Sequence, residues 1–366
     1  MGGATISFLN MVKGLHDRGY EIVVIIRKAD PVFLQNINNI GIRCIYSRIA
    51  FSAYKKQQNR LSELVNLLKL WVIKIYSFIC LYKVILKEKP DIVHSNTGVL
   101  HEPFWVSKVC KIPHVWHLRE YQDKDFHMTI VPSKSFFSKC LKHSYVISIT
   151  KGIHNHFGLE ECKQHRVIYN GVLPISSAVT QPIKEKFFLC SSRVSHEKGH
   201  EDVIRSFAVF YETHKDYKLI ILGFGDDNYI SHLKKICKEQ HCEDAVVFEG
   251  YKQCVTSYMQ KCKALIVASY YEGFGRMTAE AAFCGCLVIG RNTGGTKEIL
   301  ERIDGLSFLS RDELTSRMEE TANMSKERYL SMVSKSQKTA LDLYSNENNI
   351  NSIDKFYCDI LANKVK

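Results

Sequence analysis

Short apolar runs rich in Val and Ile recur along this chain, and helical patterns separate them. The first series comprises residues 22–26, 92–94, 114–116 and 145–149. The second series comprises residues 187–190, 219–222, 245–248, 265–267 and 287–289. Apolar runs of this kind are typical of parallel strands buried on both faces, and their alternation with helices indicates βαβ units. The sequence therefore predicts two doubly wound α/β units, one after the other.

The turn-forming stretch Tyr-Asn-Gly-Val-Leu-Pro at residues 169–174 separates the two series. A chain of 366 residues is long enough for two domains, each with its own core. We therefore predict an N-terminal domain over residues 1–168 and a C-terminal domain over 169–345. A final helical pattern follows over residues 346–366.

Composition and cysteine usage indicate a cytoplasmic globular protein. Hydrophobic residues make up 45% of the chain and charged residues 24%, as in soluble domains. No charged segment followed by an apolar run begins the chain, and we expect no apolar segment long enough to span a bilayer. The 13 cysteines include no C-x-x-C pair, which favours scattered reduced thiols over a zinc site.

The positive charge is concentrated in the first half of the chain. Residues 1–165 contain 23 Lys and Arg against 12 Asp and Glu, a net of +11, and the remaining 27 against 26 leave +1. A basic half attracts a polyanion. Because no zinc finger, helix-turn-helix or aromatic-interleaved basic motif is present, we expect no nucleic acid. An anionic membrane surface, or an acceptor carried on a lipid diphosphate, is the predicted partner.

Residues 64–86 are apolar but are interrupted by Lys69, Lys74 and Lys83. An interfacial helix whose lysines meet anionic headgroups would have this pattern. A helix packed on the sheet with solvated lysines would have it too. The sequence leaves both alternatives open.

The loop with the most chemical information is Glu-Gly-Phe-Gly-Arg-Met-Thr-Ala-Glu at residues 272–280. An apolar strand precedes it and a helix of small residues, 279–285, follows. Helix N-termini hold phosphates through unpaired N–H groups and the positive end of the dipole. Carboxylates beside such a terminus can accept hydrogen bonds from sugar hydroxyls. The combination predicts a site for a sugar attached to a diphosphate.

These residues resemble a known family. The glutamates of residues 272–280 are similar to the E-x7-E motif of retaining glycosyltransferases of family 4. Four further segments resemble that family's motifs in the same order, and they are residues 192–199, 220–225, 247–250 and 292–298. The resemblance covers about residues 165–300, and five motifs in register are far more specific than one alone.

The resemblance implies the GT-B architecture, in which two Rossmann-like domains face each other across a cleft. It implies that the C-terminal domain binds a nucleotide sugar, that the N-terminal domain binds the acceptor, and that the last helix returns to the first domain. It also implies retaining transfer from a nucleotide-diphosphate donor, most often UDP-linked, to a glycan or lipid-linked acceptor. We expect a role in surface polysaccharide synthesis, capsule or lipopolysaccharide, on the cytosolic face of a membrane.

The charges that develop during sugar transfer indicate which residues should contact the donor. Negative charge grows on the leaving diphosphate, so fixed donors must stabilise it, and Arg193 and Lys198 are the predicted pair. By resemblance, Glu272 contacts the donor sugar. Glu280, expected in the first helical turn, binds the ribose, although a role as a helix cap is the alternative. Backbone N–H groups of Phe274 and Gly275 are expected to face the sugar and phosphates.

Other positions carry weaker expectations. Gly223 and Gly225 resemble the G-x-G turn near the nucleotide. Arg276 is expected either to contact a substrate or to be exposed. In the N-terminal domain, His117 is expected near the transferred sugar as a catalytic residue. The residues expected on the acceptor side are Arg119, Glu120, Gly2 and Gly3.

The N-terminus departs from the family pattern. The resemblance implies a strand before Gly2, and we expect the N-terminal domain to lack it. A miscalled start or a truncated gene would explain the loss, and a true short form of the protein is the alternative. Such a loss would leave neighbouring strands unpaired.

No D-x-D pair stands at a strand end, so we expect neither a metal nor another cofactor. Two other functions remain open: a nucleotide-sugar epimerase of the same architecture, and a truncated, non-catalytic protein that binds a nucleotide sugar.

Overall fold

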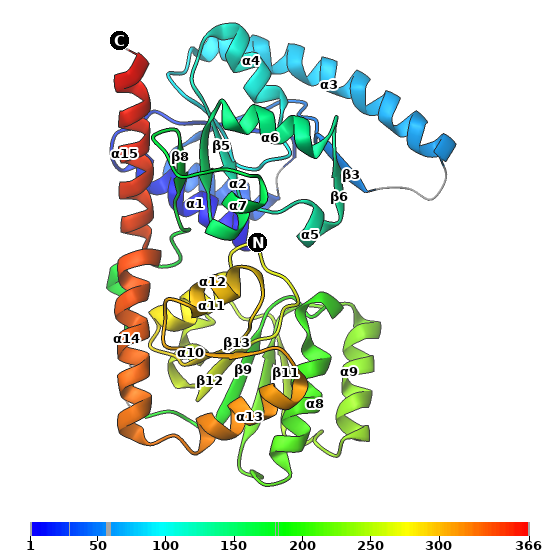
Figure 1. Cartoon of the computed structure of the whole chain (residues 1–366), viewed down its shortest axis with the longest axis vertical. Helices are drawn as coiled ribbons and strands as arrows, with labels where there is room; N and C mark the ends of the chain where they lie inside the picture. The colour runs from blue at the N-terminus through cyan, green and yellow to red at the C-terminus, as the bar shows by residue number, and fades with distance from the viewer. Residues whose placement is uncertain (1, 29, 56–59, 180, 182, 365–366) are drawn as a thin grey trace. The chain divides into compact units, whose positions relative to one another are not determined.

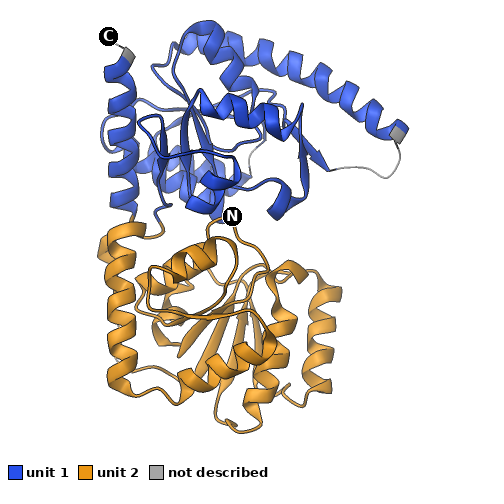
Figure 2. Ribbon diagram, in the orientation of Figure 1, with its two compact units in different colours: residues 1–171, 346–366 blue, residues 172–345 orange. Residues whose placement is uncertain are grey.

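The computed structural model describes residues 2–28, 30–55, 60–179, 181 and 183–364. The chain forms two compact units, one of residues 1–171 with 346–366 and the other of residues 172–345 (Figure 2). We call these unit 1 and unit 2. The predicted linker at residues 169–174 spans the first of these boundaries, and the C-terminal segment belongs to unit 1.

Unit 2 is built on one parallel sheet of six strands (Figure 1). The strands are β9 (Phe187–Ser191), β10 (Lys218–Leu222), β11 (Val246–Gly250), β12 (Ala264–Val267), β13 (Val288–Arg291) and β14 (Leu306–Phe308). Their spatial order is β11-β10-β9-β12-β13-β14. The order reverses between β9 and β12, and open α/β sheets bind ligands at the carboxyl ends of the strands at such a point.

Helices cover the sheet of unit 2 and bury apolar side chains against it. The helix of residues 200–211, for example, has an apolar stripe that is fully buried in the core and consists of Val203, Ile204, Phe207 and Phe210. Burying one side chain of this size contributes about 1.5–3 kcal/mol. The helices are α8 (His200–Tyr211), α9 (Asp227–Glu239), α10 (Thr256–Lys261), α11 (Arg276–Phe283), α12 (Gly294–Leu300), α13 (Arg311–Ala322) and α14 (Lys326–Tyr344).

Unit 1 contains a parallel sheet of β4 (Val93–Ser95), β5 (His114–Leu118), β7 (Tyr145–Ser148) and β8 (His165–Val167). Separate ladders join β1 (Val23–Ile26) to β2 (Arg43–Tyr46) in parallel, and β3 (Ala53–Lys55) to β6 (Met128–Ile130) antiparallel. The helices are α1 (Gly3–His16), α2 (Pro31–Ile40), α3 (Arg60–Glu88), α4 (Glu102–Cys110), α5 (Asp123–Phe126), α6 (Lys134–Lys142), α7 (Lys151–His156) and α15 (Asn346–Lys364). Helix α1 is the first element of the described structure.

The C-terminal helix α15 is part of unit 1 because its apolar face packs on α1. Leu15 of α1 and Ile353 and Phe356 of α15 share one core. A Cβ at Gly14 would lie 2.0 Å from Ile350 Cδ1, so a glycine lets the two helices approach closely.

Helix α3 overturns one expectation from the sequence. Its segment Leu61–Glu88 is long and apolar enough to cross a membrane by length and composition, so the prediction that no segment could do so is wrong. Only 17% of its most apolar window is buried. Figure 1 shows α4 beside the C-terminal end of α3, where Leu81 and Ile85 are buried. On its other side the helix presents apolar side chains such as Leu68, Val72 and Ile75 to solvent.

Candidate functional site

The loop after β9 carries Arg193 and Lys198 to the point where the strand order of unit 2 reverses. It makes a short 3-10 turn, His196–Lys198, and enters α8 through Gly199. Gly199 has φ 70°, and a Cβ there would lie 2.3 Å from the carbonyl oxygen of Ala268 at the end of β12. Only glycine fits this backbone position. The loop therefore lies directly against the end of β12.

Gly223 and Gly225 hold the same loop from the other side. The N–H of Ser192 donates to Leu222 O at 3.1 Å and that of Val194 to Phe224 O at 2.7 Å. A Cβ on Gly223 would be 1.8 Å from Ser192 O. The G-x-G turn thus allows the backbone of the β10 loop to pack on the residues flanking Arg193. Its contact with a nucleotide stays a prediction.

The Glu272 loop is also fixed by backbone contacts. Gly295 N–H donates to Glu272 O at 2.8 Å, and a Cβ on Gly294 would lie 2.5 Å from the same oxygen. The ring of Phe274 is buried against Tyr344, with 5.9 Å between the ring centroids. This aromatic side chain therefore anchors the loop, and only its backbone is left to face a ligand.

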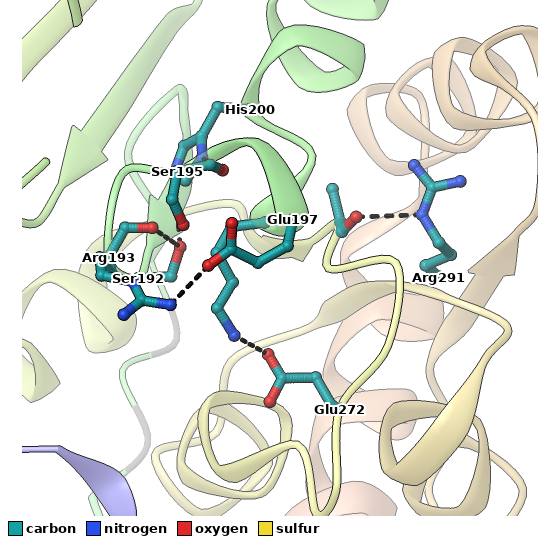
Figure 3. Close-up of polar contacts among 9 residues, drawn as sticks. Ser192, Arg193, Ser195, Glu197, His200, Glu272 and Arg291 are labelled. Carbon is teal, nitrogen blue, oxygen red and sulfur yellow. Dashed lines mark hydrogen bonds and ion pairs between the residues drawn. The ribbon is translucent and has the colours of Figure 1, made fainter. Parts of the chain in front are cut away.

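The structure brings together the acidic and basic residues that the sequence predicted separately. Lys198 Nζ donates to Glu272 Oε1 at 2.7 Å, and the two side chains are 21% and 23% exposed. Arg193 forms an exposed ion pair with Glu197 (Figure 3). The N-terminus of α11 begins four residues after Glu272, at Arg276. The positive charge of Lys198 and a helix N-terminus thus lie together at the strand reversal, and both features favour an anion.

Glu280 lies differently from the prediction. Because α11 begins at Arg276, with Gly275 at φ 84° as its N-cap, Glu280 falls in the second turn and cannot cap the first. Its carboxylate accepts from Arg276 Nε at 2.6 Å, and burial raises the pKa of Glu280 in spite of this partner. Arg276 also donates to Val172 O at 2.7 Å and its side chain is only 14% exposed, so of its two predicted alternatives the exposed one is wrong. The ribose contact of Glu280 stays a prediction.

Sequence reasoning missed two residues that brace the site. Arg291, at the end of β13, donates to Ala268 O at 3.0 Å and to Asp202 at 2.6 Å, which ties the end of β12 to α8. His200 is fully buried and contacts Ser192 Oγ at 3.3 Å. Burial lowers the pKa of His200 to about 4, so the ring is neutral at pH 7. The position of Arg291 directly before the 292–298 motif was the available signal.

An exposed aromatic pair also escaped prediction. Phe224 and Tyr251 follow β10 and β11, and their rings stack with centroids 5.1 Å apart and planes at 9°. Large exposed rings at the carboxyl ends of parallel strands offer a flat apolar platform.

In unit 1, the predicted His117 is fully buried on β5. Its Nδ1 lies 3.2 Å from His94 Nε2, and His94 Nδ1 lies 2.6 Å from the hydroxyl of Tyr357 on α15. Burial, with Arg119 nearby, holds the pKa of His117 well below its usual range, so the ring is neutral. Its proximity to a transferred sugar stays a prediction.

Arg119 and Glu120 also lie inside unit 1. Arg119 donates to Asn96 Oδ1 at 2.8 Å and to Asn170 Oδ1 at 2.7 Å, which joins two loops. Glu120 accepts from Gly98 N at 3.2 Å and from the hydroxyl of Thr97. Gly2 is the exposed N-cap of α1, and Gly3 is the first residue of that helix. An acceptor role for these four residues stays a prediction.

The buried Glu120 carboxyl predicts a pH-dependent stability. Burial raises the pKa of Glu120 from 4.5 to about 7. A raised pKa means that the folded state binds this proton more tightly than the unfolded state does. The contribution of Glu120 to the free energy of unfolding is therefore complete below pH 4.5 and declines as the pH rises towards 7. Glu120→Gln should remove this decline, which amounts to up to about 3 kcal/mol in the free energy of unfolding. Urea unfolding between pH 5 and 8 measures it.

The control for this prediction is Glu301→Gln, an exposed carboxylate on the surface of unit 2. It should leave the pH dependence of unfolding as in the unsubstituted protein. A Glu120→Gln variant with an unchanged pH profile would show that Glu120 ionises normally.

Two family models together match most of the chain. "Glycosyltransferase Family 4" matches residues 1–173, and "Glycosyl transferases group 1" matches residues 175–333. A relative from Klebsiella pneumoniae, an uncharacterized 42.6 kDa protein in the cps region, is 24% identical over 84% of this chain and 86% of its own. A Campylobacter jejuni relative, N-acetylgalactosamine-N,N'-diacetylbacillosaminyl-diphospho-undecaprenol 4-alpha-N-acetylgalactosaminyltransferase, is 34% identical over 29% of this chain and 28% of its own.

The fold has solved counterparts as well. The crystal structure of Anabaena Alr3699/HepE in complex with UDP and glucose superposes with a TM-score of 0.74 at 19% identity, covering 98% of this chain and 96% of that one. This likeness, with the paired α/β units, confirms the predicted GT-B fold class. The two family models assign the chain to glycosyltransferase family 4.

Proposed function

We propose that this glycosyltransferase moves a sugar, with retention of configuration, from a UDP-linked donor to a glycan or lipid-linked acceptor of a surface polysaccharide. The Lys198–Glu272 pair at the strand reversal, beside the N-terminus of α11, is the observation that carries the proposal. The UDP-bound Anabaena structure and the diphospho-undecaprenol named for the Campylobacter relative support the donor and the acceptor class. We place the reaction at the cytosolic face of a membrane.

The proposed chemistry follows from where charge develops. The donor diphosphate would lie at the N-terminus of α11, within reach of Lys198 and the exposed Arg193. As the glycosidic bond breaks, negative charge grows on the diphosphate. These preoriented positive groups would stabilise that charge more than they stabilise the intact donor.

The ion pair suggests how the site changes when the donor binds. In the free protein Lys198 neutralises Glu272. A bound diphosphate would compete for Lys198, and Glu272 would then accept hydrogen bonds from the donor sugar and face the positive charge that grows on its ring. The nucleotide base would stack on the Phe224–Tyr251 platform.

Product analysis tests this proposal against its two rivals. The protein is incubated with UDP-sugars, with and without an oligosaccharide or undecaprenyl-diphosphate-sugar acceptor, after a thermal-shift screen has chosen the base. Transfer should release UDP only with acceptor, and NMR should show the donor's anomeric configuration in the product. Conversion of the donor alone would support the epimerase, and donor binding without turnover would support the non-catalytic protein.

We expect activity without a metal ion, because Arg193, Lys198 and the helix N-terminus supply positive charge at the diphosphate position. Transfer measured after treatment with excess EDTA should match transfer in added Mg²⁺ or Mn²⁺. A loss in EDTA that the metal restores would overturn this expectation.

A further inference from the structure

Helix α3 has an unusual distribution of polar and apolar side chains. The side that packs on the rest of unit 1 carries the buried polar residues Lys74 and Ser77 together with the buried Leu81 and Ile85. Its opposite side exposes a continuous apolar stripe at helical spacing, formed by Leu68, Trp71, Val72, Ile75, Tyr76 and Ile79. A helix face in contact with water normally carries polar side chains, so this exposed apolar stripe is suited to an apolar phase.

Polar contacts fix α3 in this orientation. Lys74 Nζ lies 2.8 Å from Glu102 Oε1 of α4, and both residues are buried. Lys74 also donates to Ser52, and Ala50 N donates to Ser77 Oγ at 3.1 Å. Turning the apolar stripe inward would expose these contacts and bury apolar residues against them, and breaking a buried ion pair is costly. The stripe is therefore held outward.

A groove adjoins the stripe. It has a volume of about 700 Å³ and lies between α3, α4 and α6. Its apolar lining comes from Trp71, Ile75 and Phe78 of α3, Trp105 and Val109 of α4, and Phe136 of α6. Because Trp71 and Ile75 belong to both features, stripe and groove form one apolar surface.

The charges beside this surface identify its partner. Residues 64–87 contain no Asp or Glu, and Lys69, Lys83 and Lys87 are exposed along the helix. Arg48 stacks over the Tyr76 ring at 5.1 Å. A second copy of this chain would bring the same lysines against one another, whereas an anionic surface would pair with them.

We propose that the apolar stripe of α3 docks unit 1 onto an anionic phospholipid bilayer, with the helix lying along the interface and the groove open to the lipid. Interfacial helices combine an apolar stripe, aromatic residues and lysines in this way. The helix does not cross the bilayer, because Leu81, Ile85 and the Lys74–Glu102 pair keep it packed on the protein. This proposal does not depend on the transfer reaction.

Vesicle co-flotation of the full chain tests the proposal. The protein should float with vesicles of phosphatidylglycerol and phosphatidylcholine, bind pure phosphatidylcholine at least about tenfold more weakly, and be released by high salt. The triple variant Trp71→Ser, Ile75→Ser and Ile79→Ser should lower binding to the anionic vesicles by at least about tenfold. Lys69→Gln with Lys83→Gln and Lys87→Gln should remove the preference for anionic vesicles.

Matched controls separate docking from misfolding and self-association. Val209→Ser with Leu309→Ser removes exposed apolar side chains of unit 2 and should leave vesicle binding unchanged. All variants should keep the melting temperature of the unsubstituted protein, since the replaced side chains are exposed.

Fluorescence gives a site-specific readout. The chain has three tryptophans, and Trp116 is buried, so a blue shift on adding anionic vesicles should come from Trp71 and Trp105 and should shrink in Trp71→Phe. No flotation with anionic vesicles, or equal flotation of the triple variant, overturns the proposal. The proposal is also overturned if light scattering shows a dimer that the triple variant no longer forms, while the protein does not bind vesicles.

Discussion

Glu272→Ala is expected to lower kcat for sugar transfer by about 10²- to 10³-fold, the effect of removing one preorganised electrostatic group from an active site. The affinity for UDP should stay the same or rise, because the substitution frees Lys198 from the 2.7 Å ion pair and leaves it available to the diphosphate. Steady-state kinetics with a UDP-sugar and calorimetric titration with UDP measure the two quantities separately.

The partner variant distinguishes this account from a general loss of structure. Lys198→Ala should weaken UDP binding and transfer together, since Lys198 is proposed to contact the diphosphate in both states. Glu301→Ala, which removes an exposed carboxylate elsewhere on unit 2, should change neither UDP binding nor transfer. The assigned roles fail if Glu272→Ala lowers UDP affinity and leaves kcat intact.

The main strands were predictable because burial on both faces requires apolar, β-branched runs. β9, β10, β12 and β13 lie where such runs stand in the sequence. The short strands β3, β6 and β8 were not predicted, since three-residue ladders of mixed composition carry no periodic signal.

For the candidate site, the sequence predicted which residues lie there more successfully than it predicted which residues they contact. The start of α11 was placed too late because the small-residue run at 279–285 is the stronger pattern, whereas the left-handed Gly275 begins the helix earlier. The Lys198–Glu272 pair joins residues 74 positions apart, and the Lys74–Glu102 pair joins two different helices. Such pairings depend on tertiary packing, which no local pattern records.

Glu280→Ala is expected to destabilise unit 2 by about 3–5 kcal/mol, because it removes the carboxylate that pairs with the Arg276 guanidinium, whose side chain is only 14% exposed. Arg276 also holds the backbone of Val172 at the beginning of unit 2, so the loss should be seen in the unfolding of that unit. Urea unfolding of Glu280→Ala, Arg276→Met and the double variant measures the coupling. The double variant should be more stable than Glu280→Ala, since it also removes the positive charge that Glu280 balances.

The same residue is proposed to bind the ribose, and a ligand comparison separates that role from the structural one. UDP and 2′-deoxy-UDP are titrated into the unsubstituted protein and into Glu280→Gln, which keeps the side-chain shape and can still accept from Arg276. If the carboxylate binds the ribose 2′-hydroxyl, the unsubstituted protein should prefer UDP, and this preference should fall in Glu280→Gln. If Glu280 only anchors Arg276, both proteins should show the same ratio of affinities whatever their stability. The ribose role then fails, and the ion pair alone accounts for the position of Glu280 in the helix.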